Sequence, residues 1–385
     1  MEPQLPEFNP WERADVTTNK RDYFGKFNEF FDANKGLHST TKLAALKASP
    51  FVVSLISYTG IQRLFMCSGM IVNSNGADGD FSSTILTSAS LLKCPTRKHS
   101  IANNIKVDVY VANGNLYEGT IVGCDFHYNV AAISINSSIY QKPAMIANID
   151  GSNEAVHRST PTSFSLVPHR DTTITLHPDM AVIGLGRYYD HPYHIMAAPG
   201  ALRLVDCDLD CKELLVADCE MTKNGIGGTI ISCSGFVIGM SFYEAGYTPF
   251  LPINIAMKCM ERLQNYRKVP RLWLGLKLSD LDIASLGELE TLHRTFPGLV
   301  EGAVVRQVDP KSPASRAGLC MGDVIVQLDE KPVKRSLKFM SLMLDNVNKP
   351  MEVIVKRAGT IAPLTLTLIP QMQRKFNRWP IPEER

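Results

Sequence analysis

Short apolar runs separated by turn residues fill the chain from residue 48 to residue 242. Each run is about four to seven residues long, and glycine, asparagine or aspartate recurs between runs at a spacing of about ten residues. Many short strands without long helical patterns between them are typical of an all-β barrel or sandwich, and they exclude an enzyme of alternating strands and helices. The runs are 51–57, 64–72, 84–87, 105–111, 117–122, 130–135, 180–184, 213–216, 229–231 and 236–242.

A different pattern begins near residue 255. Apolar residues at helical spacing over 255–266, followed by Pro270, predict a helix that closes the β unit. Five strands and two helices are then expected within about 100 residues, which is a compact α+β unit. The helices are a short one at 313–317, ended by Gly318, and a longer one at 336–344 with an apolar stripe. The strands are 272–278, 302–308, 323–328, 351–355 and 364–369.

These patterns divide the 385 residues into four segments. A β-barrel domain at 46–268 and an α+β domain at 269–370 lie between an N-terminal arm at 1–45 and a C-terminal tail at 371–385. The arm is rich in proline and polar residues, has a helix-like stretch at 23–31, and is expected to be partly ordered. The tail contains arginines and prolines and is expected to be exposed.

The composition restricts the partners and the compartment. With 40 Lys+Arg, 38 Asp+Glu and a net charge of +2, the chain is not expected to bind nucleic acid, so its partners must bind at local sites. Nine cysteines, a sparse and odd number, suit reduced thiols. No run of about 18 apolar residues occurs, and the acidic N-terminus resembles neither a secretory signal nor a transit peptide. These features predict an intracellular, soluble protein without a membrane span, in the cytoplasm or nucleus.

The stretch 302–329 combines a strand, a Pro-Ala helix, a Gly-Asp turn and a second strand. Gly318 can take the left-handed conformation that stops the short helix, and Gly322 allows a tight turn before the second strand. This stretch resembles a PDZ domain. The resemblance implies that a peptide adds a strand to an open sheet edge, while backbone N–H groups hold its terminal carboxylate.

By this resemblance the second wall of the peptide groove is the helix 336–344. In the alternative interpretation the same apolar residues are core, and the groove is closed or contacts the neighbouring domain. The carboxylate loop, and hence the expected peptide-binding site, is Trp273, Leu274, Gly275 and Leu276.

Three segments of the β unit carry a second resemblance. Residues 85–92 resemble a strand and turn that usually read Leu-Thr-x-Ala-His, and 122–135 resemble a stretch that usually ends Asp-Leu-Ala-Val-Leu-x-Ile. Residues 218–239 resemble a nucleophile loop that usually reads Gly-Asn-Ser-Gly-Gly-Pro. Their order and the PDZ-like unit that follows are similar to the Deg/HtrA family of serine proteases. Over residues 45–370 the resemblance implies a mainly β fold, with a trypsin-like double β-barrel domain before a PDZ domain.

The same resemblance places Ser90 at the histidine position, Asn129 at the aspartate position and Ile226 at the serine position of the catalytic triad. Acyl transfer needs an imidazole base, a carboxylate that orients it and a nucleophilic hydroxyl. None of the three substitutes can perform its role. The triad is therefore expected to be degenerate, and Thr229 replaces the usual proline. The former oxyanion loop around Ile226 is Asn224, Gly225, Gly227 and Gly228.

Other residues of the β unit offer weaker chemistry. His127 precedes Asn129 by two positions, so on a strand both side chains would point to one side. No carboxylate spacing singles out this histidine as a base. The possible nucleophiles near the old loop are Cys219, Ser232, Cys233 and Ser234.

Neither a metal nor a cofactor is expected. Cysteines and histidines cluster in the second half of the β unit, but their spacing differs from the paired cysteines of structural zinc sites. A bridge between Cys67 and Cys94 is not expected in a reducing compartment. The clustered residues are Cys207, Cys211, Cys219, His191 and His194.

These observations favour a catalytically inactive protease homologue that binds peptides, protein C-termini or unfolded chains as a scaffold. The family resemblance alone would assign a serine-type endopeptidase of protein quality control. A third hypothesis is a regulatory subunit in a mixed oligomer with active relatives, since the resemblance implies trimers. Aromatic residues of the arm would pack on a neighbouring subunit or on their own barrel. They are Trp11, Tyr23, Phe24, Phe27, Phe30 and Phe31.

Overall fold

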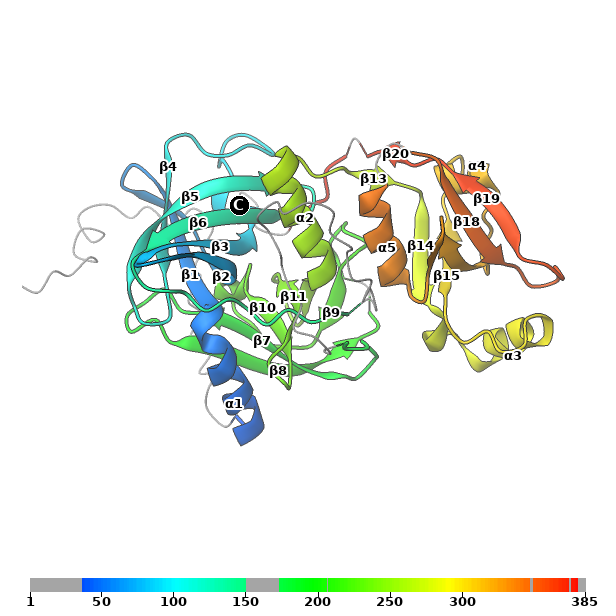
Figure 1. Ribbon diagram of the computed structural model, residues 1–385, viewed down its shortest axis with the longest axis horizontal. Helices are drawn as coiled ribbons and strands as arrows, with labels where there is room; N and C mark the ends of the chain where they lie inside the picture. Colours follow the sequence, from blue (N-terminus) through cyan, green and yellow to red (C-terminus); the bar gives the residue numbers. More distant parts are fainter. Residues whose placement is uncertain (1–36, 150–172, 206, 347–348, 374, 380–385) are drawn as a thin grey trace, which may run out of the picture.

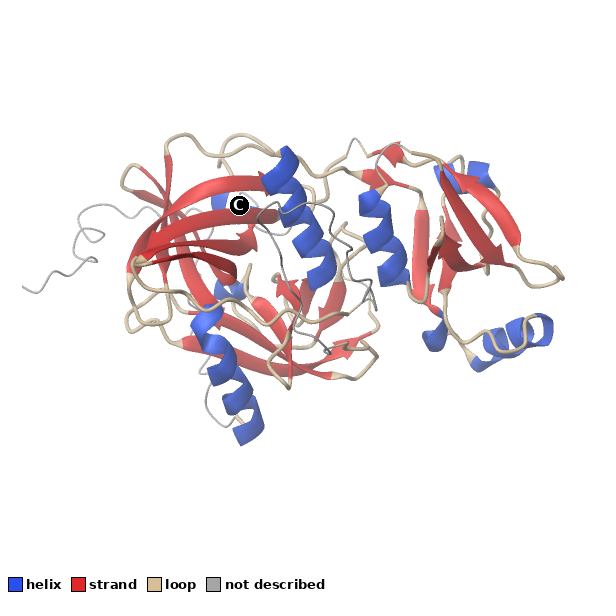
Figure 2. Ribbon diagram, in the orientation of Figure 1, coloured by secondary structure: helices blue, strands red, loops and turns tan. Residues whose placement is uncertain are grey.

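Two β barrels and a smaller sheet domain follow one another along the chain in the computed structural model (Figure 1). The structure describes residues 37–149, 173–205, 207–346, 349–373 and 375–379, so the predicted helix-like stretch at 23–31 and the arm aromatics lie outside it. In both domains more residues lie in strands than in helices (Figure 2). The predicted fold class, a trypsin-like double barrel followed by an α+β domain, is confirmed.

The first barrel is a closed sheet of six strands in the order β1-β2-β3-β6-β5-β4. Its interior is filled by apolar side chains, and Gly69 leaves room for them, because a Cβ there would lie 2.7 Å from Leu55 and 2.9 Å from Ile85. The apolar runs therefore fold as the sequence indicates. The strands are β1 (Val52–Thr59), β2 (Gln62–Ala77), β3 (Asp80–Ser88), β4 (Ile105–Tyr110), β5 (Leu116–Asp125) and β6 (Val130–Ser137).

The second barrel repeats this topology with the strand order β10-β11-β12-β9-β8-β7. Two of its strands contain proline and were not predicted. In β8, Pro199 is exposed and paired in register with Ile183 of β7. The strands are β7 (Ala181–Arg187), β8 (Ile195–Arg203), β9 (Leu215–Ala217), β10 (Thr229–Ser232), β11 (Val237–Ser241) and β12 (Thr248–Pro252).

Two helices pack on the barrels. Helix α1 (Ser39–Ala48) lies against β7 and β8 and straddles the predicted boundary between arm and barrel domain. Helix α2 (Ile253–Tyr266) packs on β5, β6 and β11 through a buried apolar face, and it ends at Arg267, which has a left-handed conformation. The predicted closing helix is therefore present.

The α+β domain has one main sheet with the order β14-β15-β16-β18-β19, and β14 lies at an edge. The predicted strand at 272–278 is wrong in one respect, because Gly275, with φ of +68°, splits it in two. Helix α3 (Leu286–Thr295) was not predicted. The strands are β13 (Leu272–Trp273), β14 (Leu276–Asp280), β15 (Ala303–Val308), β16 (Val324–Leu328), β17 (Lys331–Pro332), β18 (Met351–Lys356), β19 (Leu364–Leu368) and β20 (Gln371–Met372), and the other helices are α4 (Pro313–Ala317) and α5 (Ser336–Asp345).

Helix α5 joins the two domains. Lys258 of α2 forms an ion pair with Asp345 at 2.6 Å, and Arg262 donates a hydrogen bond to the Leu344 carbonyl at 2.6 Å. The apolar side chains of Leu337 and Leu344 are part of the barrel core. One face of α5 therefore belongs to the barrel domain and the other to the small sheet. No helix in the described ranges is long and apolar enough to cross a membrane.

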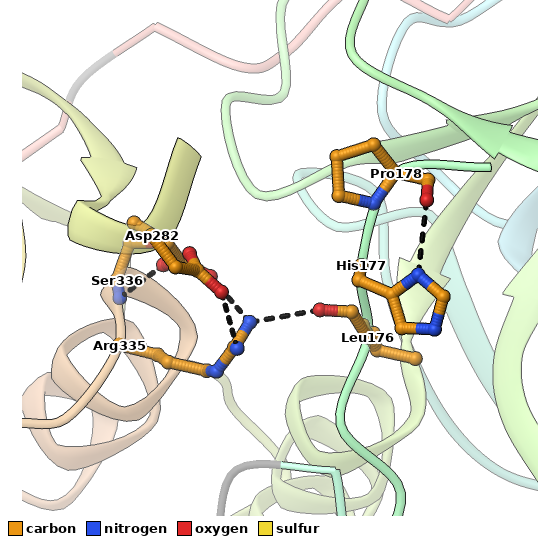
Figure 3. A network of polar contacts seen from close by, with 7 residues as sticks. Leu176, His177, Pro178, Asp282, Arg335 and Ser336 are labelled. Carbon is orange, nitrogen blue, oxygen red and sulfur yellow. Dashed lines mark hydrogen bonds and ion pairs between the residues drawn. The ribbon is translucent and has the colours of Figure 1, made fainter. Parts of the chain in front are cut away.

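A second polar contact lies at the start of α5 (Figure 3). Arg335 donates to the Leu176 carbonyl of the barrel domain at 2.8 Å and forms ion pairs with Asp280 at 3.0 Å and Asp282 at 2.6 Å. The amide of Ser336 donates to Asp280 at 2.7 Å. These bonds tie the N-terminus of α5 to the end of β14 and to the barrel domain at once.

Candidate functional site

The structure brings Ser90 and Asn129 into direct contact. Ser90 lies in the short 3-10 helix Ala89–Leu92 after β3, and Asn129 lies in the turn between β5 and β6. The amide oxygen of Asn129 accepts hydrogen bonds from the Ser90 hydroxyl at 3.2 Å, the Ser90 N–H at 2.9 Å and the Ser88 hydroxyl at 2.9 Å. Both residues are only 4% exposed. A neutral amide and two hydroxyls thus make up this cluster, at the positions where the resemblance predicts a histidine and an aspartate.

Ser88 was missed as a member of this cluster. It precedes Ser90 by two residues, and its hydroxyl also accepts the Ser90 N–H at 3.2 Å. The signal was present, because a serine just before a short helix commonly caps it. None of the three side chains titrates near neutral pH.

The loop around Ile226 directs its backbone N–H groups inward. It forms the 3-10 helix Lys223–Gly225, in which the Ile226 N–H donates to the Lys223 carbonyl at 3.1 Å. The Gly227 N–H donates to Ser241 at 2.8 Å. An oxyanion site needs N–H groups aimed at the substrate, and these groups are bonded inside the protein. The amides of Gly225 and Gly228 are likewise bonded to the carbonyls of Thr222 and Gly225.

The Ile226 loop packs against the strand that leads to Ser90. A Cβ on Gly227, which has φ of +73°, would lie 2.6 Å from the Ser68 carbonyl and 2.8 Å from the Ser88 nitrogen. The Ser68 N–H donates to the Ile226 carbonyl at 2.8 Å. The predicted positions therefore meet at one place, with Ile226 only 3% exposed.

In the predicted carboxylate loop, unlike the Ile226 loop, the internal hydrogen bonds are made by backbone carbonyls. The Leu274 carbonyl accepts the Ala314 N–H at 3.0 Å, and the Gly275 carbonyl accepts the Asp309 N–H at 2.8 Å. In a trans peptide the C=O and the next N–H point in opposite directions. The amides of Gly275 and Leu276 therefore point away from these partners.

The loop leads directly into β14, the edge strand of the sheet. Its other end is anchored by Trp273, since β13 pairs with β20. Helix α5 contacts β14 and β15, and the resemblance assigns this helix to the second wall of a peptide groove. The other face of α5 contacts α2 of the barrel domain. The alternative interpretation includes such a contact with the neighbouring domain. An unpaired edge and outward amides can accept a peptide strand with a terminal carboxylate.

Comparison with known proteins finds relatives that cover both domains of the chain. The PDZ domain model matches residues 273–368. Putative protease Do-like 14 of Arabidopsis thaliana is 29% identical over 344 residues, which cover 85% of this chain and 70% of that protein. Serine endoprotease DegS of Escherichia coli strain K12 is 23% identical over 359 residues, 87% of this chain and 84% of its own. This chain is a homologue of the Do-like, HtrA-type serine proteases.

Solved structures of HtrA-type proteases also align with the chain. The serine endoprotease from Yersinia pestis has 19% identity and a TM-score of 0.45, and the alignment covers 88% of this chain and 99% of that one.

In this HtrA homologue His127, the histidine considered as a base, faces the C-terminal tail. His127 lies in the turn after β5 and not on a strand, so the expected strand geometry is wrong. Its Nδ1 accepts the Asn377 N–H at 3.3 Å. Burial, and next the charge of Arg271, lower the pKa of His127 to about 4, so the ring is neutral at pH 7.

The candidate nucleophiles of this homologue do not gather around His127. Burial raises the pKa of the Cys219 thiol to about 12, so its thiolate is scarce at neutral pH. Ser232 ends strand β10, and Cys233 and Ser234 follow it in the hairpin, at the far end of the strand from Gly228.

The cysteine and histidine cluster shows no metal geometry. Within the described ranges, no three His, Cys, Asp or Glu side chains come close enough together to hold a metal ion. Cys211 instead donates to the Glu213 carboxylate at 3.2 Å. Cys67 and Cys94 are both free thiols.

The tail contradicts one expectation about the homologue. It was expected to be exposed, but Phe376, Asn377 and Trp379 are partly buried, because the chain returns from β20 to the barrels (Figure 1). These contacts join residues about 250 positions apart, such as Asn377 and His127. No local sequence pattern could indicate them.

Proposed function

We propose that this HtrA homologue is catalytically inactive and binds peptides or protein C-termini through its PDZ domain, as a scaffold or regulatory subunit. The observation that carries the proposal is the cluster of Ser90, Asn129 and Ile226. The first two are hydrogen-bonded to each other, and the third has no nucleophilic atom. Ser90 and Asn129 supply neither a base nor a carboxylate, so neither of them can activate a nucleophile.

The backbone at the site supports the same conclusion. The Ile226 N–H is bonded to the Lys223 carbonyl, and the Gly227 N–H is bonded to Ser241. An acyl-transfer enzyme that has lost its triad keeps residual catalysis from its oxyanion hole. Here the N–H groups of Ile226 and Gly227 are unavailable to an oxyanion, so we expect no residual turnover.

The peptide-binding part of the proposal rests on the carboxylate loop. The outward amides of Gly275 and Leu276 and the free edge of β14 suit a peptide with a free C-terminus. A peptide whose terminal carboxylate is replaced by an amide should bind at least about tenfold more weakly, because it loses a charge-assisted hydrogen bond. Fluorescence polarisation of matched peptides, with acid and amide ends, measures this ratio.

Two assays separate an inactive homologue from a serine endopeptidase. The full-length protein is incubated with a serine-directed phosphonate probe and, separately, with unfolded casein, with trypsin as the positive control. We expect neither labelling nor cleavage. Cleavage that persists in an Ile226→Ala variant would reveal a different active site and refute the proposed inactivity.

Assembly is the last part of the proposal. We infer that the homologue acts as a homo-oligomer or joins an active relative in a mixed oligomer, as resemblance to the family implies. Light scattering of the protein alone, and mixed with an active relative, distinguishes a monomer from either oligomer. A molar mass of one chain under both conditions would refute this part and leave the PDZ function intact.

A further inference from the structure

The tail segment, defined here as residues 375–379, lies on both barrels. Its first aromatic ring, Phe376, stacks on His99 with 4.0 Å between ring centres and 10° between planes. The guanidinium of Arg271 lies 4.1 Å from the same ring centre. Both groups are too close to share one face of the ring, so they cover opposite faces. Phe376 is therefore clamped between an imidazole and a cation.

The main chain of the tail segment is held as well. The Asn377 N–H donates to His127 Nδ1 at 3.3 Å, and the Asn377 side chain donates to the His127 carbonyl at 2.9 Å. The Arg378 N–H donates to the Asp210 carboxylate at 3.0 Å, and the guanidinium of Arg378 lies 3.8 Å from the same carboxylate. Two consecutive backbone N–H groups are thus bound by side chains from different barrels.

A second aromatic residue closes the contact. The indole N–H of Trp379 donates to the His127 carbonyl at 3.2 Å, and its ring packs on Phe242 with 4.5 Å between ring centres. His127 belongs to the first barrel, and Phe242 and Asp210 belong to the second. The tail segment therefore spans the boundary between the barrels.

This boundary adjoins the former catalytic positions. His127 precedes Asn129 by two residues. Phe242 follows Ser241, whose hydroxyl donates to the Gly225 carbonyl at 2.7 Å and whose carbonyl accepts the Gly227 N–H. The partners of the tail segment are thus one or two residues away from the groups that surround Ile226.

We propose that the boundary between the barrels is a second peptide-binding site, separate from the carboxylate loop, and that the tail segment Phe-Asn-Arg-Trp is its ligand in cis. Phe376, Arg378 and Trp379 recognise the site through ring and charge contacts, so the ligand class is a peptide with the pattern Phe-x-Arg-Trp. Its protein side, called the seam site, consists of His99, His127, Asp210, Phe242 and Arg271.

Tethering makes the tail segment a strong competitor. A ligand on a short linker experiences an effective concentration in the millimolar range, so a free peptide of the same sequence enters only when the tail leaves. The seam site combines residues of both barrels with Arg271, which lies between α2 and β13. The proposal is independent of the proposed inactivity and of peptide binding at the carboxylate loop.

The test uses full-length protein and a fluorescent peptide with the sequence of residues 375–381. A variant with Phe376→Ala and Trp379→Ala releases the tail segment and should bind the peptide at least tenfold more tightly than the parent does. Adding Asp210→Asn or Phe242→Ala to this variant should weaken binding again, at least threefold and tenfold respectively. Asp210 is 33% exposed, so the first of these changes leaves the core intact.

The controls keep the test decisive. Lys375→Ala removes an exposed side chain of the same segment and should leave peptide binding at the parental level. In the parent, hydrogen exchange at the amides of Asn377 and Arg378 should be at least tenfold slower than in the free peptide. Exchange at the free-peptide rate, or equal peptide binding by parent and released variant, would overturn the proposal.

Discussion

The Ile226 loop and the carboxylate loop are built in the same way and face opposite directions. Each contains a glycine with positive φ, +73° at Gly227 and +68° at Gly275. At each, a Cβ would lie within 2.6 Å of a neighbouring group. In the first loop both the N–H groups and the Ile226 carbonyl are bonded inside the protein, whereas in the second the internal bonds go to the carbonyls of Leu274 and Gly275.

Under the proposed function, this difference decides which loop binds an anion. A peptide unit has a positive N–H end and a negative C=O end, and the end that is bonded internally is lost to a ligand. Bonding the carbonyls of Leu274 and Gly275 internally leaves their partner N–H groups for a carboxylate. Bonding the Ile226 N–H to the Lys223 carbonyl withdraws this donor from an oxyanion. Under the proposed function, the chain has lost one anion site and kept another.

The largest expected effect comes from breaking the carboxylate loop. In Gly275→Ala the new Cβ would lie 2.3 Å from the Cβ of Ser312, which is fully buried, and the residue would keep a left-handed conformation. Together, strain and overpacking should cost about 3 to 4 kcal/mol of unfolding free energy. Binding of a C-terminal peptide should become undetectable. Urea unfolding and fluorescence polarisation measure the two effects.

A matched control is Gly322→Ala in the same domain. Gly322 has φ of +89°, but no atom lies within 4 Å of its added Cβ. This change should cost only the strain, about 1 kcal/mol, and leave peptide binding intact. Equal losses in both variants would mean that the close approach at Gly275 has no structural role.

The next largest effect is expected in the hydrogen-bonded cluster of Ser88, Ser90 and Asn129, beside the Ile226 loop. In Asn129→Ala the Ser90 N–H and the hydroxyls of Ser88 and Ser90 lose their shared acceptor in a buried site. Unsatisfied buried donors should reduce the unfolding free energy by about 3 kcal/mol. Peptide binding by the PDZ domain should not change.

The control for Asn129 is Asn104→Ala. Asn129 has a positive φ of +55°, and Asn104 has one of +49°, but the side chain of Asn104 is exposed. Its replacement should cost about 1 kcal/mol, the price of the backbone conformation alone. A loss as large as that of Asn129→Ala would show that conformation, and not the buried donors, accounts for the effect.

Local patterns predicted most strands of both domains because apolar runs with turn residues need no distant information. Helix α3 was missed although Ser285 and Glu288 form a capping box, which is a readable signal. Strands β8 and β12 were missed because their prolines break the pattern.

The candidate site was predictable only in part. The positions of Ser90, Asn129 and Ile226 follow from the resemblance, and the structure brings them together. The direction of the loop amides was not predictable, because it depends on which carbonyl each N–H meets in the folded chain. The seam site depends on contacts between residues about 250 positions apart, for which a single sequence offers no signal.

Acidification should weaken the barrel domain and not the carboxylate loop. The His127 pKa falls to about 4 in the folded protein, below its value of about 6.5 in an unfolded chain. Between these values the unfolded state binds a proton that the native state does not, so stability falls as the pH decreases from 6.5 to 4. The loss should reach about 3 kcal/mol, measured by urea unfolding.

A variant of His127 that cannot titrate tests whether this histidine causes the pH dependence. Its ring faces Arg271 and the Asn377 N–H. The main-chain N–H of His127 donates to Asp125, whose raised pKa changes stability with pH in the opposite sense. His127→Asn keeps an acceptor but does not titrate, so its pH dependence should be flatter than that of the parent. Replacing the exposed His293 in the same way should change nothing. A parental slope in His127→Asn would exclude this histidine as the cause.

The smallest expected effect is on activity, when the three side chains that the resemblance implies for an active triad are introduced. The variant with Ser90→His, Asn129→Asp and Ile226→Ser should show phosphonate labelling within about tenfold of the parent. The amide at position 226 would still donate to the Lys223 carbonyl, and a triad without an oxyanion site stabilises no tetrahedral intermediate. Thermal unfolding verifies that the variant is folded. A larger rise would mean that the loop reorients once the serine is present, and that the contrast between the two loops lies in their side chains and not in their backbone.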